Sequence, residues 1–342
     1  HAGNFGHNVQ TFIPYGSRSI FEAAAVSGII MSYDAFQTVI NMGGEMVNPH
    51  KNIVRGVLIS MLITAAIYIM LQVAFIGAIS PASLAKSGWH GINFASPFAD
   101  IAILLSLNWL AVLLYMDAFV SPFGTGVAFV ATATRALAAM THTGHLPKWL
   151  GRLERRYMIP RFAMVADLIL ATILVNVFRN WSLLATVITG STLIAYLTGP
   201  VTVISLRKMA PDLKRPFAPK WLAPFAFVVT GLAIYWTMWP TTVQVIFVIA
   251  LGLPIYLYYE WRYQKTNWRQ QLRSAAWLIC YMIFISLISY AGSEGFGGQN
   301  WIPYPFDFIV IILVSLFFYA WAVNSRMTKV DPAAKKVNER LK

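Results

Sequence analysis

The sequence predicts an all-helical integral membrane protein that crosses the bilayer about nine times. Of its 342 residues, 58% are hydrophobic and only 11% are charged, whereas about a quarter of the residues of an ordinary soluble domain are charged. The mean hydropathy is +0.61. The apolar residues fall in long runs, and runs near the ~20 residues that cross ~30 Å of hydrocarbon recur along the chain. A soluble protein of this size could not cover its surface with so few charges.

The apolar runs define the expected spans, and polar segments separate them. Two adjacent spans can also merge into one, and each boundary can shift by a few residues, so the number nine is approximate. The expected spans are 19–45, 53–78, 109–134, 160–178, 182–206, 221–239, 241–260, 274–292 and 306–324.

The basic residues indicate how the spans are oriented. Of 26 Lys and Arg residues, only Arg18, Lys86 and Arg179 lie in one set of alternate loops, and the others lie in the second set. The positive-inside rule makes the second set cytoplasmic. The chain is then expected to begin outside and end in the cytoplasm, in the cell (inner) membrane with lipids around it. The net charge of +13 therefore reflects topology, and nucleic acid is not an expected partner.

The first expected span, 19–45, is too polar for a helix that faces lipid. Ser32, Tyr33 and Asp34 lie at its centre, and its second half is polar as well. A carboxylate at mid-membrane costs at least ~2.5–3 kcal/mol and is normally found in the protein interior or in a water-filled cavity. Transporters use discontinuous helices for substrate sites, because the free N–H and C=O groups bind charged ligands. The sequence therefore predicts a broken helix with a site at Asp34; the alternative is a buried helix in which Asp34 is paired for structural reasons.

A second polar stripe lies in span 109–134. Asp117, Ser121, Thr125 and Phe129 are four residues apart and so share one helix face. Pro122 and Gly124 are expected to interrupt the hydrogen-bond ladder of the helix beside them and so to free backbone carbonyl groups. An acid, two hydroxyls and an aromatic ring suit a hydrated path, while the alternative is a packing stripe in which the hydroxyls bond to their own helix.

Several segments together resemble the amino acid–polyamine–organocation (APC) permeases, in consistent order from about residue 19 to 260. The runs 32–35 (SYDA) and 43–53 (GGEMVNPHKNI) are similar to the family's sixth transmembrane helix and the loop after it. Run 117–126 (DAFVSPFGTG) resembles a helix-eight motif of the subgroup that contains bacterial aspartate–proton symporters. Runs 135–147 and 207–217 resemble the loops after helices eight and ten.

The resemblance implies the fold of the leucine transporter, in which two inverted five-helix repeats surround a central site with broken first and sixth helices. Residues 1–18 would be an external loop, 19–206 the second repeat, 207–263 helices eleven and twelve, 264–325 an extra C-terminal helix pair and 326–342 a cytoplasmic tail.

The start of the chain also bears on this expectation. The first residue is His1, and the polar segment after it lacks the features of a signal peptide. We expect the chain to be the C-terminal part of a longer protein, whose N-terminal helices one to five would supply the rest of the substrate site. The alternative is that the first span inserts by itself with its N-terminus outside.

The resemblance and the polar pattern together predict the site. The family's gating aromatic on helix six would lie six residues before Asp34, where this sequence has Gly28, so the substrate's size stays open. Protons are expected to be carried by Asp34 and Asp117, and Ser121 and Thr125 would form a polar pathway. The expected substrate-binding residues are Gly28, Met31, Ser32, Tyr33, Asp34 and Phe129.

The function predicted is amino acid transport by proton symport, and the helix-eight motif favours an acidic amino acid. The alternatives are an amino acid or polyamine exchanger of the same fold, or a membrane-embedded protein without transport activity. An enzyme is not expected, because the six histidines show no ligand pattern and no catalytic constellation is present. With Cys280 the single cysteine, neither a metal site nor a cofactor is expected.

Overall fold

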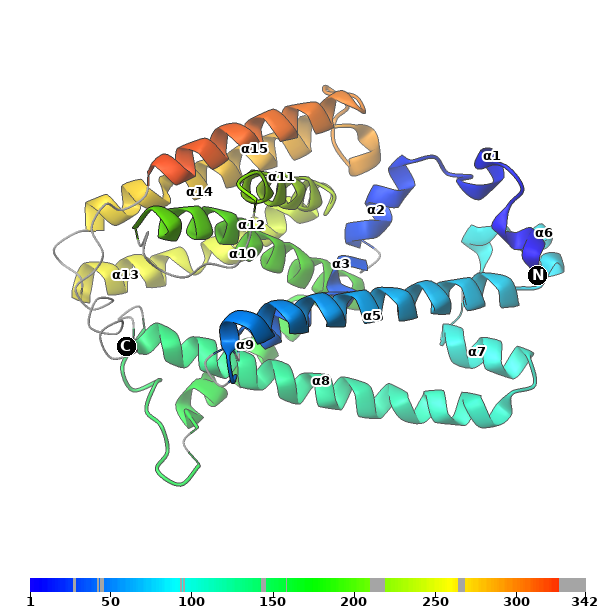
Figure 1. The fold of residues 1–342 in the computed structure, drawn as a ribbon, viewed down its shortest axis with the longest axis horizontal. Coiled ribbons are helices and arrows are strands. Elements are labelled where there is room, and N and C mark those ends of the chain that lie inside the picture. Colours follow the sequence, from blue (N-terminus) through cyan, green and yellow to red (C-terminus); the bar gives the residue numbers. More distant parts are fainter. Residues whose placement is uncertain are drawn as a thin grey trace. The chain divides into compact units, whose positions relative to one another are not determined.

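The computed structural model describes residues 1–26, 29–41, 43, 46–92, 94, 96–142, 146–157, 159–209, 219–263 and 268–325. These residues are almost entirely helical and contain no strand. The helices are α1 (Val9–Phe12), α2 (Arg18–Val26), α3 (Ile29–Ser32), α4 (Phe36–Asn41), α5 (Pro49–Ala78), α6 (Pro81–Ser87), α7 (Pro97–Leu104), α8 (Asn108–His142), α9 (Arg161–Val177), α10 (Trp181–Met209), α11 (Leu222–Tyr235), α12 (Thr241–Ala250), α13 (Leu253–Tyr263), α14 (Trp268–Ala291) and α15 (Phe306–Asn324), with short 3-10 turns η1 (Ala2–Phe5), η3 (Trp89–Gly91) and η4 (Glu294–Phe296) (Figure 1).

Helices occur at every predicted span, which confirms the all-α membrane fold. Within the described residues, 6 stretches are long and apolar enough to cross a bilayer: those of α5, α8, α10, α14 and α15, and one that joins α12 to α13. At the other three predicted positions the helices are shorter. The first span is divided among α2, α3 and α4, α9 has 17 residues and α11 has 14.

The chain forms two compact units. The first comprises residues 1–19 and 33–136, and the second comprises 20–32 and 137–342. The boundary near the first break thus falls between Ser32 and Tyr33. Within the second unit α11 packs against α10, α14 and α15, and α12 packs against α10 and α14 (Figure 1).

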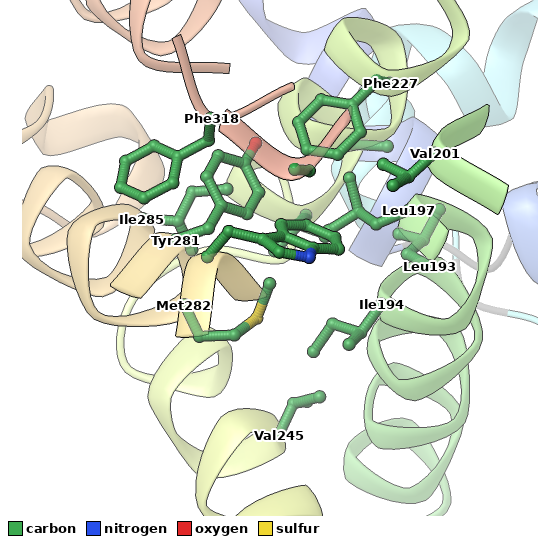
Figure 2. Close-up of a cluster of buried hydrophobic side chains, with 14 of the residues drawn as sticks. Leu193, Ile194, Leu197, Val201, Phe227, Val245, Tyr281, Met282, Ile285 and Phe318 are labelled. Atoms are coloured by element: carbon green, nitrogen blue, oxygen red, sulfur yellow. The ribbon is translucent and has the colours of Figure 1, made fainter. Parts of the chain in front are cut away.

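Apolar side chains from five helices form the core of the second unit. Figure 2 shows the ring of Tyr281 between those of Phe227 and Phe318, with centroid distances of 5.3 Å to each. Burial of this kind fixes how the helices cross, because aromatic pairs have preferred geometries. The fully or nearly fully buried members are Val187, Leu193, Ile194, Leu197, Val201, Phe227, Ala233, Ile234, Val245, Trp277, Tyr281, Met282, Ile285, Phe318 and Ala322.

Two glycines let the helices of this core approach closely. A Cβ on Gly231 of α11 would overlap the Tyr281 hydroxyl and would lie 2.8 Å from Ser315 Oγ. A Cβ on Gly190 of α10 would lie 2.9 Å from a methyl group of Val245 on α12. Small residues at such crossings are typical of membrane helix packing, which depends on close contact rather than on the hydrophobic effect.

In the first unit, α5 begins at an Asn-Pro turn. Asn48 has a left-handed backbone with φ 51° and ψ 58°, and Pro49 occupies the first helical position, where a missing N–H costs nothing. The carbonyl of Asn48 accepts from the N–H groups of Lys51 and Asn52, each at 3.1 Å. The Asn52 side chain donates back to the Val47 carbonyl at 2.5 Å. The Asn-Pro pair therefore turns the chain sharply into the long helix.

Helix α8 runs without interruption from Asn108 to His142, with Pro122 inside it. The expected interruption of the hydrogen-bond ladder at Pro122 therefore does not end the helix. Proline removes one backbone hydrogen bond, but local adjustments within a membrane helix tolerate that loss.

Candidate substrate and proton site

The first predicted span is broken, as its polar centre indicates. Helix α3 ends at Ser32, residues 33–35 form a turn, and α4 begins at Phe36. After the turn, the backbone N–H of Gln37 donates to the carbonyl of Asp34 at 3.2 Å and restarts the helix. The backbone N–H of Thr38 likewise donates to the carbonyl of Ala35 at 3.1 Å.

The turn is held by a ring contact with α5. Tyr33 meets Tyr68 edge to face, with centroids 5.4 Å apart and planes at 74°. Asp34 follows in the same turn and is half-buried. Its carboxyl group thus lies beside an anchored aromatic residue and is still partly accessible.

The predicted substrate-binding residues separate into two groups. Tyr33, Asp34 and Phe129 belong to the first unit, and Met31 and Ser32 belong to the second. Gly28 lies outside the described residues. In the second unit α3 contacts α10, so Met31 and Ser32 end a helix that is attached to the core.

The polar stripe on α8 is helical throughout. Asp117, Ser121 and Thr125 are exposed, and Phe129 is 47% exposed. The opposite face is also exposed but strongly apolar, with Phe119 and Phe123 at its centre. One side of α8 thus suits hydrocarbon and the other suits water or a polar partner.

A fully buried carboxylate was missed by the sequence reasoning. Asp307, in the first turn of α15, accepts hydrogen bonds from the Tyr235 hydroxyl at 2.7 Å, the Ser293 hydroxyl at 2.9 Å and the Phe308 N–H at 2.8 Å. An Asp at the start of a helix is ordinary in sequence. Its partners come from α11 and from the residues after α14, so only the tertiary structure brings them together.

Two apolar grooves lie on the second unit. One, of about 520 Å³, is lined by residues of α14 and α15 that include Cys280 and Phe284. The other, of about 220 Å³, lies among α10, α12, α13 and α14. Their linings are aliphatic, aromatic and sulfur-containing side chains, so neither suits the charged ends of an amino acid. Among the described residues, no group of three or more His, Cys, Asp or Glu could hold a metal ion.

Comparison with known proteins identifies the family. The model of the amino acid permease family matches residues 1–259. The chain is 43% identical over its whole length to the glutamate/serine transporter AimA of Bacillus subtilis (strain 168) and covers 64% of that protein. It is 33% identical, over 94% of its length, to the aspartate-proton symporter of the same organism and covers 63% of it. The branched-chain amino acid permease BcaP of Bacillus subtilis (strain 168) is 27% identical to the chain. The match covers 76% of this chain and 55% of BcaP.

The chain thus spans somewhat less than two thirds of the length of the first two relatives. No solved structure matches it. The family match covers the broken first span, the α8 stripe and the helices up to α13, which confirms the resemblance that the motifs indicated. The chain belongs to the amino acid permease family.

Proposed function

We propose that the complete protein is a secondary active transporter that moves an acidic amino acid across the cell (inner) membrane together with protons. The observation that carries the proposal is the break at residues 33–35, which leaves Asp34 half-buried in a turn between two helices of an amino acid permease. Two relatives support the substrate class, because one is named for aspartate and protons and the other for glutamate and serine.

The break would bind the substrate through its backbone and side chains. Interrupted helices in transporters present polar backbone groups that suit the carboxylate and ammonium groups of an amino acid. Met31, Ser32, Tyr33 and Asp34 would contact the substrate from the segment around the break. Gly28 and Phe129 are proposed as further substrate contacts.

Proton coupling follows from the charge of Asp34. Two negative charges in a poorly solvated site repel each other strongly. An acidic substrate therefore binds more tightly when Asp34 is protonated, and proton binding and substrate binding favour each other. Asp117 would pass the proton along α8, with Ser121 and Thr125 as the polar pathway.

The rest of the site is proposed to come from further helices of the same protein. The chain covers 64% and 63% of the first two relatives, and the predicted fold places the partner of the broken helix in another repeat. The same proposal sets the beginning of this chain outside and its C-terminus in the cytoplasm.

Uptake by the complete protein in liposomes tests the function. Radiolabelled aspartate or glutamate should accumulate when the outside is made acidic and should not respond to a sodium gradient alone. Uptake that needs unlabelled amino acid inside, and no gradient, would indicate an exchanger. No uptake of any amino acid under either condition contradicts the proposal.

Replacing the carboxyl group tests the role of Asp34. Asp34→Asn should reduce proton-driven accumulation at least tenfold, because the amide cannot carry the proton, while expression stays normal. A matched control is Asp100→Asn on α7, since Asp100 accepts the Ser96 N–H at 3.0 Å and so serves the helix start. If Asp34→Asn accumulates substrate like the unmodified protein, Asp34 has no part in coupling.

A further inference from the structure

The segment that leads from α8 to α9 folds back on the end of α8. We call residues 146–161 the α8–α9 loop, and the structure describes all of them except residue 158. Leu150 and Gly151 are buried, and a Cβ on Gly151 would overlap Oγ1 of Thr141 in the last turn of α8. The Thr141 hydroxyl donates to the Ala138 carbonyl at 2.6 Å. The beginning of the loop is therefore packed closely against its helix.

Three further contacts give the loop a defined shape. The backbone N–H of Glu154 donates to the Ile159 carbonyl at 3.0 Å and closes a turn. The Glu154 carboxylate pairs with the Arg161 guanidinium at 2.8 Å, so the same turn is also closed through side chains. The ring of Trp149 meets that of Phe162 on α9 edge to face, with centroids 5.7 Å apart. The side chains of the loop are thus presented from a folded segment.

The loop exposes basic and apolar side chains together. Its sequence contains five basic residues and one acidic residue, which give a net charge of +4. Arg156 lies over the ring of Tyr157, with its guanidinium carbon 5.2 Å from the ring centroid. A soluble loop rarely presents so many apolar groups beside its charges, and a buried one could not hold the charges. The exposed side chains are Lys148, Trp149, Arg152, Leu153, Arg155, Arg156, Tyr157, Ile159 and Arg161.

The position of the loop in the chain sets it at a membrane surface. It follows the stretch Asn108–Thr141 of α8, which is long and apolar enough to cross a bilayer. The positive-inside rule predicts that this side is cytoplasmic, and anionic lipids give the cytoplasmic leaflet a negative surface potential. Aromatic rings and the apolar stems of basic side chains settle at the headgroup boundary, with the charged ends in the polar layer. Both the charge and the apolar groups of the loop fit that layer.

We propose that the α8–α9 loop is a binding surface for the anionic phospholipid headgroups of the cytoplasmic leaflet. Arg155 and Arg156 contact lipid phosphate, because a guanidinium group presents a planar fork of donors that fits two phosphate oxygens. Leu153 and Tyr157 enter the boundary with the acyl chains. Glu154 does not oppose the phosphate, because its charge is already paired within the loop. The lipid is thus a partner in addition to the amino acid and the proton.

Quenching by labelled lipids tests the preference for anionic headgroups. The complete protein without native cysteines carries a fluorescent dye at Ile159→Cys. It is placed in phosphatidylcholine nanodiscs with a trace of nitroxide-labelled lipid, either phosphatidylglycerol or phosphatidylcholine. The labelled phosphatidylglycerol should quench the dye several-fold more strongly. Equal quenching by the two lipids overturns the inference. Quenching by neither lipid also overturns it, and would indicate a loop turned to the solvent, as a surface for an acidic protein would be.

Removal of two charges tests whether the loop carries the preference. Arg155→Gln with Arg156→Gln should abolish most of the excess quenching, because each basic side chain near an anionic surface contributes about fivefold to the affinity. The matched control is Lys51→Gln with Arg55→Gln, which removes two exposed charges from the first turns of α5 and should keep the excess. An excess that survives in the first variant, or that is lost in the control, contradicts a site on the loop.

Salt and the ring of Tyr157 separate the two kinds of contact without changing the charged residues. Raising the salt from ~0.1 M to ~1 M shortens the Debye length from ~10 Å to ~3 Å, so the excess quenching by phosphatidylglycerol should fall while quenching by phosphatidylcholine stays. Tyr157→Ala should weaken quenching by both lipids, and Tyr157→Phe should not. An excess that does not respond to salt contradicts recognition by charge. Both faces of a nanodisc are accessible and no step requires transport, so these results do not depend on the proposed orientation or function.

Discussion

At the scale of single residues, two aspartates, Asp34 and Asp307, have different environments. Asp307 is fully buried with three donors around its carboxyl group, an arrangement that suits a fixed structural role. Asp34 is half-buried in a turn between two helices. The side chain of Asp34 is therefore less enclosed by the protein than that of Asp307.

The close contact at Gly231 gives a stability prediction at the same scale. Gly231→Ala should lower the free energy of unfolding by ~1–3 kcal/mol, because the new methyl group overlaps the Tyr281 hydroxyl. Adding Tyr281→Phe removes that hydroxyl and should recover part of the loss, which a double-mutant cycle in detergent measures. Gly126→Ala, where a Cβ meets no atom within 4 Å, is the control. Equal stability of Gly231→Ala and the unmodified protein would contradict this packing.

At the scale of helices, α8 combines one polar and one apolar face along an uninterrupted helix. The structure confirms the helical spacing of the stripe from Asp117 to Phe129, and the helix continues through Pro122. The reason is that a missing N–H weakens one hydrogen bond without changing which residues share a face.

The two faces of α8 should differ in their access to water. In a cysteine-free complete protein, Ser121→Cys and Thr125→Cys should react with a water-soluble thiosulfonate reagent. Phe119→Cys and Phe123→Cys should not, because their side chains are 81% and 76% exposed on the face that we expect to contact hydrocarbon. Similar reaction rates on both faces would exclude a one-sided polar pathway.

At the scale of the whole molecule, the chain passes between its two compact units at the break of the first span. Ser32 belongs to one unit and Tyr33 to the other. A helix break at a boundary between units allows one part to move while the other stays packed, since a few backbone torsions absorb the change.

The orientation of the molecule can be tested at its two ends. In intact cells, Ser17→Cys in the cysteine-free protein should react with an impermeant maleimide, because the positive-inside rule sets this segment outside. Ser325→Cys, after α15, should react only once the membrane is permeabilised. The reverse pattern would mean that the chain is inserted the other way round.

The sequence by itself determined the membrane class, the positions of the helices, the break at Asp34 and the family. These features are local: apolar length, helical spacing and a run of polar residues are properties of neighbouring positions, and the hydrocarbon requires each span to satisfy its own backbone. The structure adds that the first span is divided among three short helices and that α8 is one continuous helix.

The tertiary structure alone decided which distant residues meet. In the sequence Asp307 is an ordinary residue at a helix start. The Tyr235 hydroxyl that donates to it lies 72 positions earlier in the chain. Phe21 and Phe308 are even farther apart in the chain, yet their rings are in contact. No local pattern encodes such pairs, because they follow from how whole helices pack, and helix packing is settled by the fit of many side chains at once.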